Sequence, residues 1–208
     1  MTVSNMKPHK SRHHKMMELI KDSFLIRPSD LRRLRIPDVY LTRLVEKGAL
    51  VRLQRGLYAP TSRREHFAHQ SLIEVAVKAP KAIFCLLSAL QFHEIGTQLP
   101  HEVWIAIGLT DRKPNISNTS IRVVKLSQGP LRFGVGEHLV NGVKLRVYSP
   151  AKTVADCFKF RNKIGLDIAI EALRDTLRQK KATTDELWQA AKVCRVSKVM
   201  LPYMESIV

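Results

Sequence analysis

The stretch RIPDVYLTRLVEKGALVRLQRGLYAP, residues 35–60, constrains the fold more than any other part of the sequence. It predicts a helix over residues 37–47, because proline suits the first turn of a helix and Gly48 suits the left-handed position just past its end. A hairpin of two short strands is expected over residues 50–59, where Gly56 can adopt the positive φ of a tight turn. A hairpin this short is marginal by itself, so it has to pack against helices.

Two further helices are expected before that stretch. Residues 14–21 carry a loose apolar stripe with helical spacing. A short second helix is expected from residue 30 onward, with Ser29 as its N-cap and Pro28 just outside it. Three helices followed by a small hairpin are typical of a winged helix-turn-helix, in which the third helix enters the major groove of DNA and the hairpin reaches phosphates or a neighbouring groove.

The third helix has one face for packing and another for binding. Leu41, Leu44 and Val45 stand at i, i+3 and i+4 and can face a core, whereas Tyr40, Arg43 and Lys47 fall together on another face. That other face suits base edges, while polar side chains of the hairpin suit the DNA backbone. The residues expected to bind DNA are Arg32, Arg33, Tyr40, Arg43, Lys47, Arg52, Gln54 and Arg55.

The charge of the chain favours a polyanionic partner. Its 208 residues include 35 Lys and Arg against 18 Asp and Glu, a formal net charge of +17 that exceeds what solubility requires. The excess is concentrated in residues 1–60 and 144–208, and nucleic acid is the commonest partner of such a surface. The alternative is that these side chains form an ordinary solvated surface and that Tyr40 and Tyr58 belong partly to the core.

The sequence supports neither a membrane protein nor a disulfide-rich protein. No apolar run approaches the ~20 residues that span a bilayer, and residues 1–17 lack the apolar segment and cleavage site of a secretory signal. A cytoplasmic protein without membrane partners is therefore expected. Cys85, Cys157 and Cys194 are widely spaced within apolar patterns, which predicts buried thiols rather than disulfides or a metal site.

Residues 65–148 carry the pattern of an α+β domain with an antiparallel sheet. Helical patterns cover residues 66–80 and 88–96, the second with Ser88 as its cap, and two strands are expected within residues 102–126. FGVGEH, which contains Gly134 and Gly136, is expected to be a turn.

The clearest hairpin signal is Asn141-Gly142, which lies between alternating apolar residues and favours a type I′ turn. After it the chain becomes helical, with Ser149-Pro150 as a cap and first-turn pair and with Thr183 and Glu186 as a capping box. The predicted organisation is a winged helix-turn-helix domain over residues 1–64 and a second domain over 65–208, divided into an α+β part at 65–148 and a helical part at 149–208.

Catalysis has weaker support. A metal-dependent nuclease would need acidic residues and a lysine that converge on a metal, and nothing in the sequence fixes such convergence. No phosphate-binding loop, dinucleotide-binding motif or nucleophile elbow is present. No enzymatic activity, metal or cofactor is expected, and a nuclease stays the distant alternative. Its candidate residues are His93, Glu94, His101, Glu102, Asp111 and Lys113.

Three stretches together resemble one known family. In chain order they are IRPSDLRRLRIPDVYLTRLVEKGALVRLQRGLYAP, CLLSALQFHEIGTQLPHEVWIAI and YSPAKTVADCFKFRNKIGLDIAIEALRD. Their order resembles the AbiEi antitoxins of type IV toxin–antitoxin, or abortive-infection, systems, over about residues 16–193. The resemblance implies a transcriptional repressor whose winged helix binds inverted repeats in its own promoter. It also implies a second domain that opposes a nucleotidyltransferase-like toxin without forming a stable complex with it.

The stretch SPAKTVADCFKFRNKIG resembles the signature of the antitoxin domain and marks a second basic surface. Basic side chains on helix faces and near helix C-termini give such a pattern without any function, which is the alternative interpretation. A stand-alone winged-helix regulator without a toxin is the other open function. The predicted functional surface of the antitoxin domain consists of Lys152, Lys159, Arg161 and Lys163.

Overall fold

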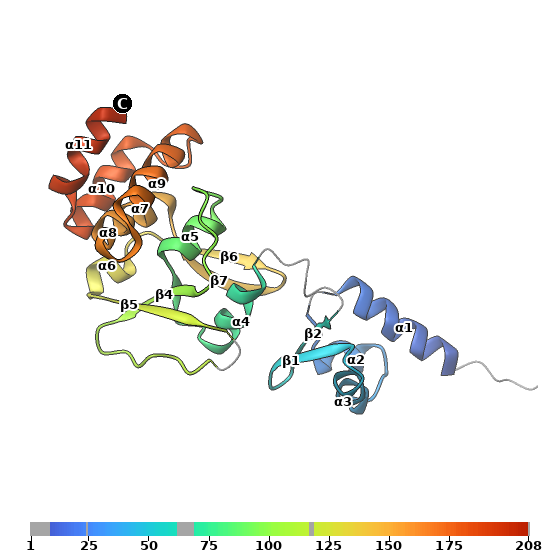
Figure 1. Cartoon of the computed structure of the whole chain (residues 1–208). Helices are drawn as coiled ribbons and strands as arrows, with labels where there is room; N and C mark the ends of the chain where they lie inside the picture. Colours follow the sequence, from blue (N-terminus) through green and yellow to red (C-terminus); the bar gives the residue numbers. More distant parts are fainter. Residues whose placement is uncertain (1–8, 24, 62–68, 117–118, 208) are drawn as a thin grey trace, which may run out of the picture. The chain divides into compact units, whose positions relative to one another are not determined.

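The computed structural model describes residues 9–23, 25–61, 69–116 and 119–207. The chain divides into two compact units, Met1–Gln70 and Ser71–Val208 (Figure 1). Each unit has its own hydrophobic core. The predicted boundary between residues 64 and 65 falls outside the described residues, so the division at that point stays a prediction.

The described part of the N-terminal unit consists of three helices and a hairpin around one small core. The elements are α1 (His9–Asp22), α2 (Pro28–Arg33), α3 (Val39–Glu46), β1 (Leu50–Gln54) and β2 (Leu57–Pro60). This is the order that the sequence predicts. Burial of apolar side chains from all three helices and from β1 holds the unit together. These core residues are Met16, Ile20, Ile26, Leu31, Ile36, Leu41, Leu44 and Leu50.

The second helix begins earlier than predicted. Pro28 is its first residue and Arg27 its N-cap, so Ser29 lies inside the helix and not at the cap. Proline suits this position because its φ is already helical and its missing N–H would have no partner there. The carboxylate of Asp30 accepts a hydrogen bond of 2.8 Å from the backbone N–H of Arg27, which closes the first turn.

The hairpin is tied to the helices by its second strand. Arg52 pairs with Tyr58 across the antiparallel ladder, and a bulge between Arg52 and Gln54 shifts the register before the turn. Gly56 has φ +76°, as a tight turn requires. Tyr58 also pairs with Ile26, the residue before the N-cap of α2, through two backbone hydrogen bonds of 2.8 and 2.9 Å.

Five strands form one sheet in the described part of the C-terminal unit. They are β3 (Ile83–Phe84), β4 (Val103–Gly108), β5 (Ile121–Leu126), β6 (Val135–Val140) and β7 (Val143–Tyr148), arranged in the order β5-β4-β3-β7-β6. The α+β class is confirmed, but the sheet is mixed: β4 runs parallel to β5, and β3 runs parallel to β7. The central strand β3 lies inside an apolar run and is too short to show a pattern of its own.

Most of the described helices of this unit follow the last strand, β7, while one precedes the first strand and two lie between strands in the chain (Figure 1). Helix α7 is almost wholly buried and packs against α5, α9, α10 and α11. Within the residues described, no helix is long and apolar enough to cross a membrane. The helices are α4 (Gln70–Lys78), α5 (Leu86–Phe92), α6 (Gln128–Arg132), α7 (Pro150–Lys159), α8 (Arg161–Ile164), α9 (Leu166–Arg178), α10 (Thr184–Cys194) and α11 (Ser197–Ile207).

The predicted type I′ turn and two predicted helix caps of this unit are confirmed, as are its buried cysteines. Asn141 and Gly142 both have positive φ, +51° and +76°, as a type I′ turn requires. Ser149 caps α7, with Pro150 in its first turn. Thr183 and Glu186 form the predicted capping box of α10. Cys85, Cys157 and Cys194 are free and buried, as predicted.

Two further local predictions are wrong. Ser88 is not a cap, because α5 begins at Leu86; its buried hydroxyl instead accepts a 2.9 Å hydrogen bond from the backbone N–H of Trp104. The stretch FGVGEH is mostly strand and not a turn, because β6 begins at Val135. Within the stretch, only Gly134, directly before the strand, has a positive φ, of +69°. In both places a tertiary contact or a strand partner decides the conformation.

Candidate nucleic-acid interface

The exposed face of α3 lies opposite its buried face. Leu41 and Leu44 are buried, whereas Val39, Thr42 and Arg43 are exposed. Since successive residues are about 100° apart around a helix, the centre of the exposed face falls near Val39. The sequence prediction placed the binding face on Tyr40, Arg43 and Lys47, and it did not name Val39 or Thr42, which also lie on the exposed side of α3.

Tyr40 is half-buried. Its ring packs against the core of the N-terminal unit, as the alternative interpretation expected. The guanidinium carbon of Arg43 lies 5.6 Å from the centre of the Tyr40 ring. This cation–π contact limits the conformations of Arg43 at the surface and points to Tyr40 as a support for the arginine.

The turn between α2 and α3 is tight. The backbone N–H of Ile36 donates to the carbonyl of Leu31 at 2.9 Å, and that of Arg35 donates to the carbonyl of Arg32 at 3.0 Å. These two bonds form a Schellman motif, in which Arg35 takes the left-handed position with φ +56°. That conformation costs a non-glycine residue about 1 to 2 kcal/mol, which the packing of Ile36 in the core has to offset.

Arg32 forms an ion pair with Asp38, the N-cap of α3. Its guanidinium donates to the same carboxylate oxygen from two nitrogens, at 2.9 and 3.3 Å. The hydrogen bond and the charge of Asp38 raise the pKa of Arg32 above its usual value. The pair joins α2 to the start of α3 and neutralises the carboxylate that directly precedes α3. Arg32 is therefore engaged within the unit.

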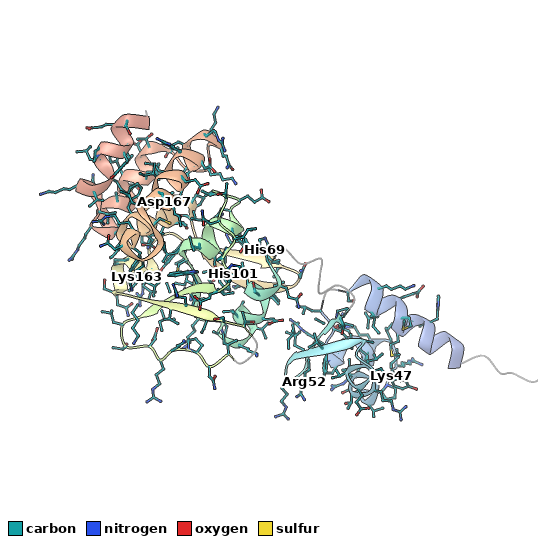
Figure 2. The ribbon with its side chains drawn as sticks, viewed as in Figure 1. Lys47, Arg52, His69, His101, Lys163 and Asp167 are labelled. Atoms are coloured by element: carbon teal, nitrogen blue, oxygen red, sulfur yellow. The ribbon has the colours of Figure 1, made fainter. Side chains whose placement is uncertain are left out.

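The hairpin adds basic side chains beside α3, which packs against β1. Arg52, on β1, and Arg55, in the turn, are exposed. Figure 2 labels Arg52 on the hairpin and Lys47 just past the end of α3. Arg33 on α2 is also exposed, as is Lys47. Gln54 belongs to β1 and not to the turn, and its side chain lies outside the described part of the structure.

The second predicted surface needs one correction. Lys152 is completely buried and therefore cannot contribute to a surface. Its ammonium group donates to the carboxylate of Asp156, one turn further along α7, and lies 4.1 Å from the centre of the Tyr148 ring. The thiol of Cys194 donates to the other carboxylate oxygen at 3.4 Å. Lys152 is a core residue because its charge has a partner inside the unit.

The carboxylate of Asp156 is the centre of this buried cluster. Burial raises the pKa of Asp156, and the charge of Lys152 opposes that rise. Burial and the Asp156 carboxylate raise the pKa of Cys194 to about 12, so its thiol stays protonated near neutral pH. The cluster links α7 to α10 and contains no reactive thiolate.

The other three predicted residues of this surface lie at the end of α7 and in α8. Lys159 and Arg161 are half-exposed, and the guanidinium of Arg161 donates to the carbonyl of Phe158 at 2.9 Å. Lys163, which Figure 2 labels, is exposed. Its ammonium lies 5.6 Å from the centre of the Phe160 ring.

Three of the six side chains considered for a nuclease have separate partners. Glu102 pairs with Arg122 at 3.0 Å, and Asp111 accepts from the backbone N–H of Gly108 at 2.8 Å. A ring nitrogen of His93 lies 2.7 Å from the carbonyl oxygen of Tyr148. In the part of the chain that the structure describes, no three His, Cys, Asp or Glu residues form a group that could hold a metal ion.

Residues 14–61 match the protein family described as "Transcriptional regulator, AbiEi antitoxin". The match covers most of α1, all of α2 and α3, and the hairpin. It confirms the predicted resemblance over the N-terminal unit and supports a regulator or antitoxin role.

The fold is similar to that of a solved structure, the Rv2827c protein of Mycobacterium tuberculosis, with a TM-score of 0.63 and 13% sequence identity. The superposition covers 96% of this chain and 78% of that protein. At this identity the similarity shows the fold alone. A comparison with curated proteins gives no significant match.

Proposed function

We propose that this protein is a DNA-binding transcriptional repressor that also acts as the antitoxin of a type IV toxin–antitoxin system. It binds inverted repeats in its own promoter and opposes a nucleotidyltransferase-like toxin without forming a stable complex with it. The observation that carries the DNA-binding part is the exposed face of α3, which includes Arg43, together with the exposed Arg52 and Arg55 of the hairpin, within the residues that match a regulator family. The function requires no catalytic residue and no cofactor.

The dimensions of α3 suit the major groove of DNA. An α-helix with its side chains is about 10 to 12 Å in diameter, and the groove is about 12 Å wide. The exposed face of α3 would point toward the bases. The hairpin then acts as the wing, with Arg52 and Arg55 close to the sugar-phosphate backbone.

The predicted DNA-binding residues take different roles in this arrangement. Arg43 reads a base, with Tyr40 as its support. Arg32 positions α3 through Asp38 and contributes little direct contact. The remaining residues bind phosphates, which fix the register of the protein on the duplex without reading sequence. These phosphate-binding residues are Arg33, Lys47, Arg52, Gln54 and Arg55.

Replacing Arg43 by Ala is expected to weaken operator binding by about 1 to 3 kcal/mol and to relax the preference at one base pair, because a bidentate contact with guanine is lost. Arg55→Ala, at the tip of the hairpin, is expected to weaken binding to all sequences about equally. Both effects can be measured by competition between the operator, mapped by footprinting, and duplexes of scrambled sequence. Equal, sequence-independent losses for the two variants would remove Arg43 from the base-reading role.

Lys159→Glu is expected to impair protection against the toxin and to leave promoter repression unchanged. The reason is that Lys159, Arg161 and Lys163 lie near one another in sequence in the C-terminal unit, whereas the DNA-reading residues all belong to the other unit. Cell growth under toxin expression and a promoter-reporter assay measure the two effects. Lys198→Glu, an exposed residue on α11, is the control for charge reversal.

Two outcomes of that test contradict the antitoxin role. Protection that survives Lys159→Glu would remove this surface from it. If the neighbouring gene encodes no toxin that the protein counteracts, the protein is a stand-alone regulator.

A further inference from the structure

Val39 is an exposed apolar residue at an unusual place. It is the first residue of α3, and 52% of its surface is exposed. Single exposed apolar residues are common on proteins and need no explanation by themselves. Val39, however, lies at the centre of the exposed face of α3, on the side opposite Leu41 and Leu44. In a helix-turn-helix, the N-terminal residues of the second helix of the motif are those that contact base edges.

The neighbours of Val39 limit what it could contact. Asp38, directly before it, is paired with Arg32, and Arg43, one turn further, is held against Tyr40. Exposed arginines at 33 and 35 lie before α3 in the same unit. An apolar side chain with basic residues nearby suits a partner that is anionic overall and carries a small apolar group. In the major groove that group is the C5-methyl of thymine.

We propose that Val39 reads a thymine by packing against its C5-methyl group in the major groove. This inference rests on the proposed DNA-binding function and adds a specific residue and a specific base to it. Val39 therefore contributes to the choice of operator, and each half-site contains a thymine at the position that faces the start of α3.

The spacing along α3 also places this thymine relative to a second base. Val39 and Arg43 are four residues apart, which is about 6 Å along the helix axis. Base pairs are stacked about 3.4 Å apart. The thymine read by Val39 and the guanine read by Arg43 should therefore be one or two base pairs apart in each half-site.

The test removes the methyl group from the DNA and the side chain from the protein. The probe is the shortest duplex that the full-length protein protects in the DNA upstream of its gene. It is prepared in a series of versions, and in each version one thymine is replaced by deoxyuridine at the matching position of both half-sites. For the unchanged protein, one of these replacements should weaken binding about fourfold per half-site, the effect of about one buried methyl group. Val39→Ala should bind the thymine and deoxyuridine duplexes equally.

Met17→Ala is the matched control. Met17 is also apolar and exposed, at 38%, in the same unit, but it belongs to α1. This variant should keep the full difference between thymine and deoxyuridine. Val39 and Met17 are both outside the core, so circular dichroism should show that both variants fold.

The outcomes separate this inference from the function on which it rests. If the protein prefers its operator but no deoxyuridine replacement weakens binding, or if Val39→Ala keeps the discrimination, the thymine contact is wrong and DNA binding stands. If the unchanged protein shows no preference for its upstream DNA over scrambled DNA, both proposals are wrong.

Discussion

Replacing Lys152 by Met is expected to lower the free energy of unfolding of the C-terminal unit by about 3 to 5 kcal/mol. Lys152 is 0% exposed and Asp156 is 1% exposed, so loss of the ammonium leaves a carboxylate without its charged partner inside the core. The cysteine thiol that also contacts Asp156 is a weak donor and cannot replace that partner. Urea unfolding followed by tryptophan fluorescence measures the loss, because both tryptophans, Trp104 and Trp188, lie in this unit.

Two further variants separate the charge from the packing. The double variant Lys152→Met with Asp156→Leu should recover most of the lost stability, since a buried ion pair can often be replaced by apolar residues of similar volume at little cost. Lys198→Met, at an exposed position, should change stability by no more than about 0.5 kcal/mol. A loss below about 1 kcal/mol for Lys152→Met would show that the pair is not important for stability.

The loss should also depend on pH. Burial already raises the pKa of Asp156, and removal of Lys152 raises it further, above its value in the unfolded chain. A group with a raised pKa in the folded state contributes stability at low pH, and that contribution is lost as the pH rises through the folded-state value. Lys152→Met should therefore destabilise the unit less at pH 5 than at pH 8. An equal loss at both pH values would contradict this.

Operator affinity is expected to fall steeply with salt concentration. Each phosphate neutralised by a basic side chain contributes about 0.9 to the slope of log affinity against log salt. Four phosphate contacts per protomer would lower the affinity on the order of 100-fold between 50 and 200 mM salt. Titrations of the operator duplex at several ionic strengths measure the slope.

Variants at the hairpin should change the salt slope by a defined amount. Arg55→Ala should reduce its magnitude by about one if the side chain lies on a phosphate. Val39→Ala should leave the slope unchanged, because a contact with a thymine methyl displaces no counterion. A flat salt response of the unchanged protein would mean that the charge of +17 serves a partner other than DNA.

Much of the N-terminal unit could be predicted from its sequence because short-range geometry decides it. Gly48 and Gly56 mark the end of α3 and the turn of the hairpin, and both adopt positive φ. The exposure of Arg43 and Lys47 follows from the apolar stripe of α3. The ion pair between Arg32 and Asp38 could not be predicted, because it depends on how the α2–α3 turn brings the two side chains together.

In the C-terminal unit, caps and tight turns such as Ser149-Pro150 and Asn141-Gly142 could be predicted from the sequence, because they involve residues within four positions of one another. Tertiary structure alone decided that the sheet is mixed and that Lys152 is buried. The i, i+4 spacing of Lys152 and Asp156 permits an ion pair on any helix. Whether that pair faces water or a core depends on α5, α9, α10 and α11, which are distant in sequence and close around α7 only after folding.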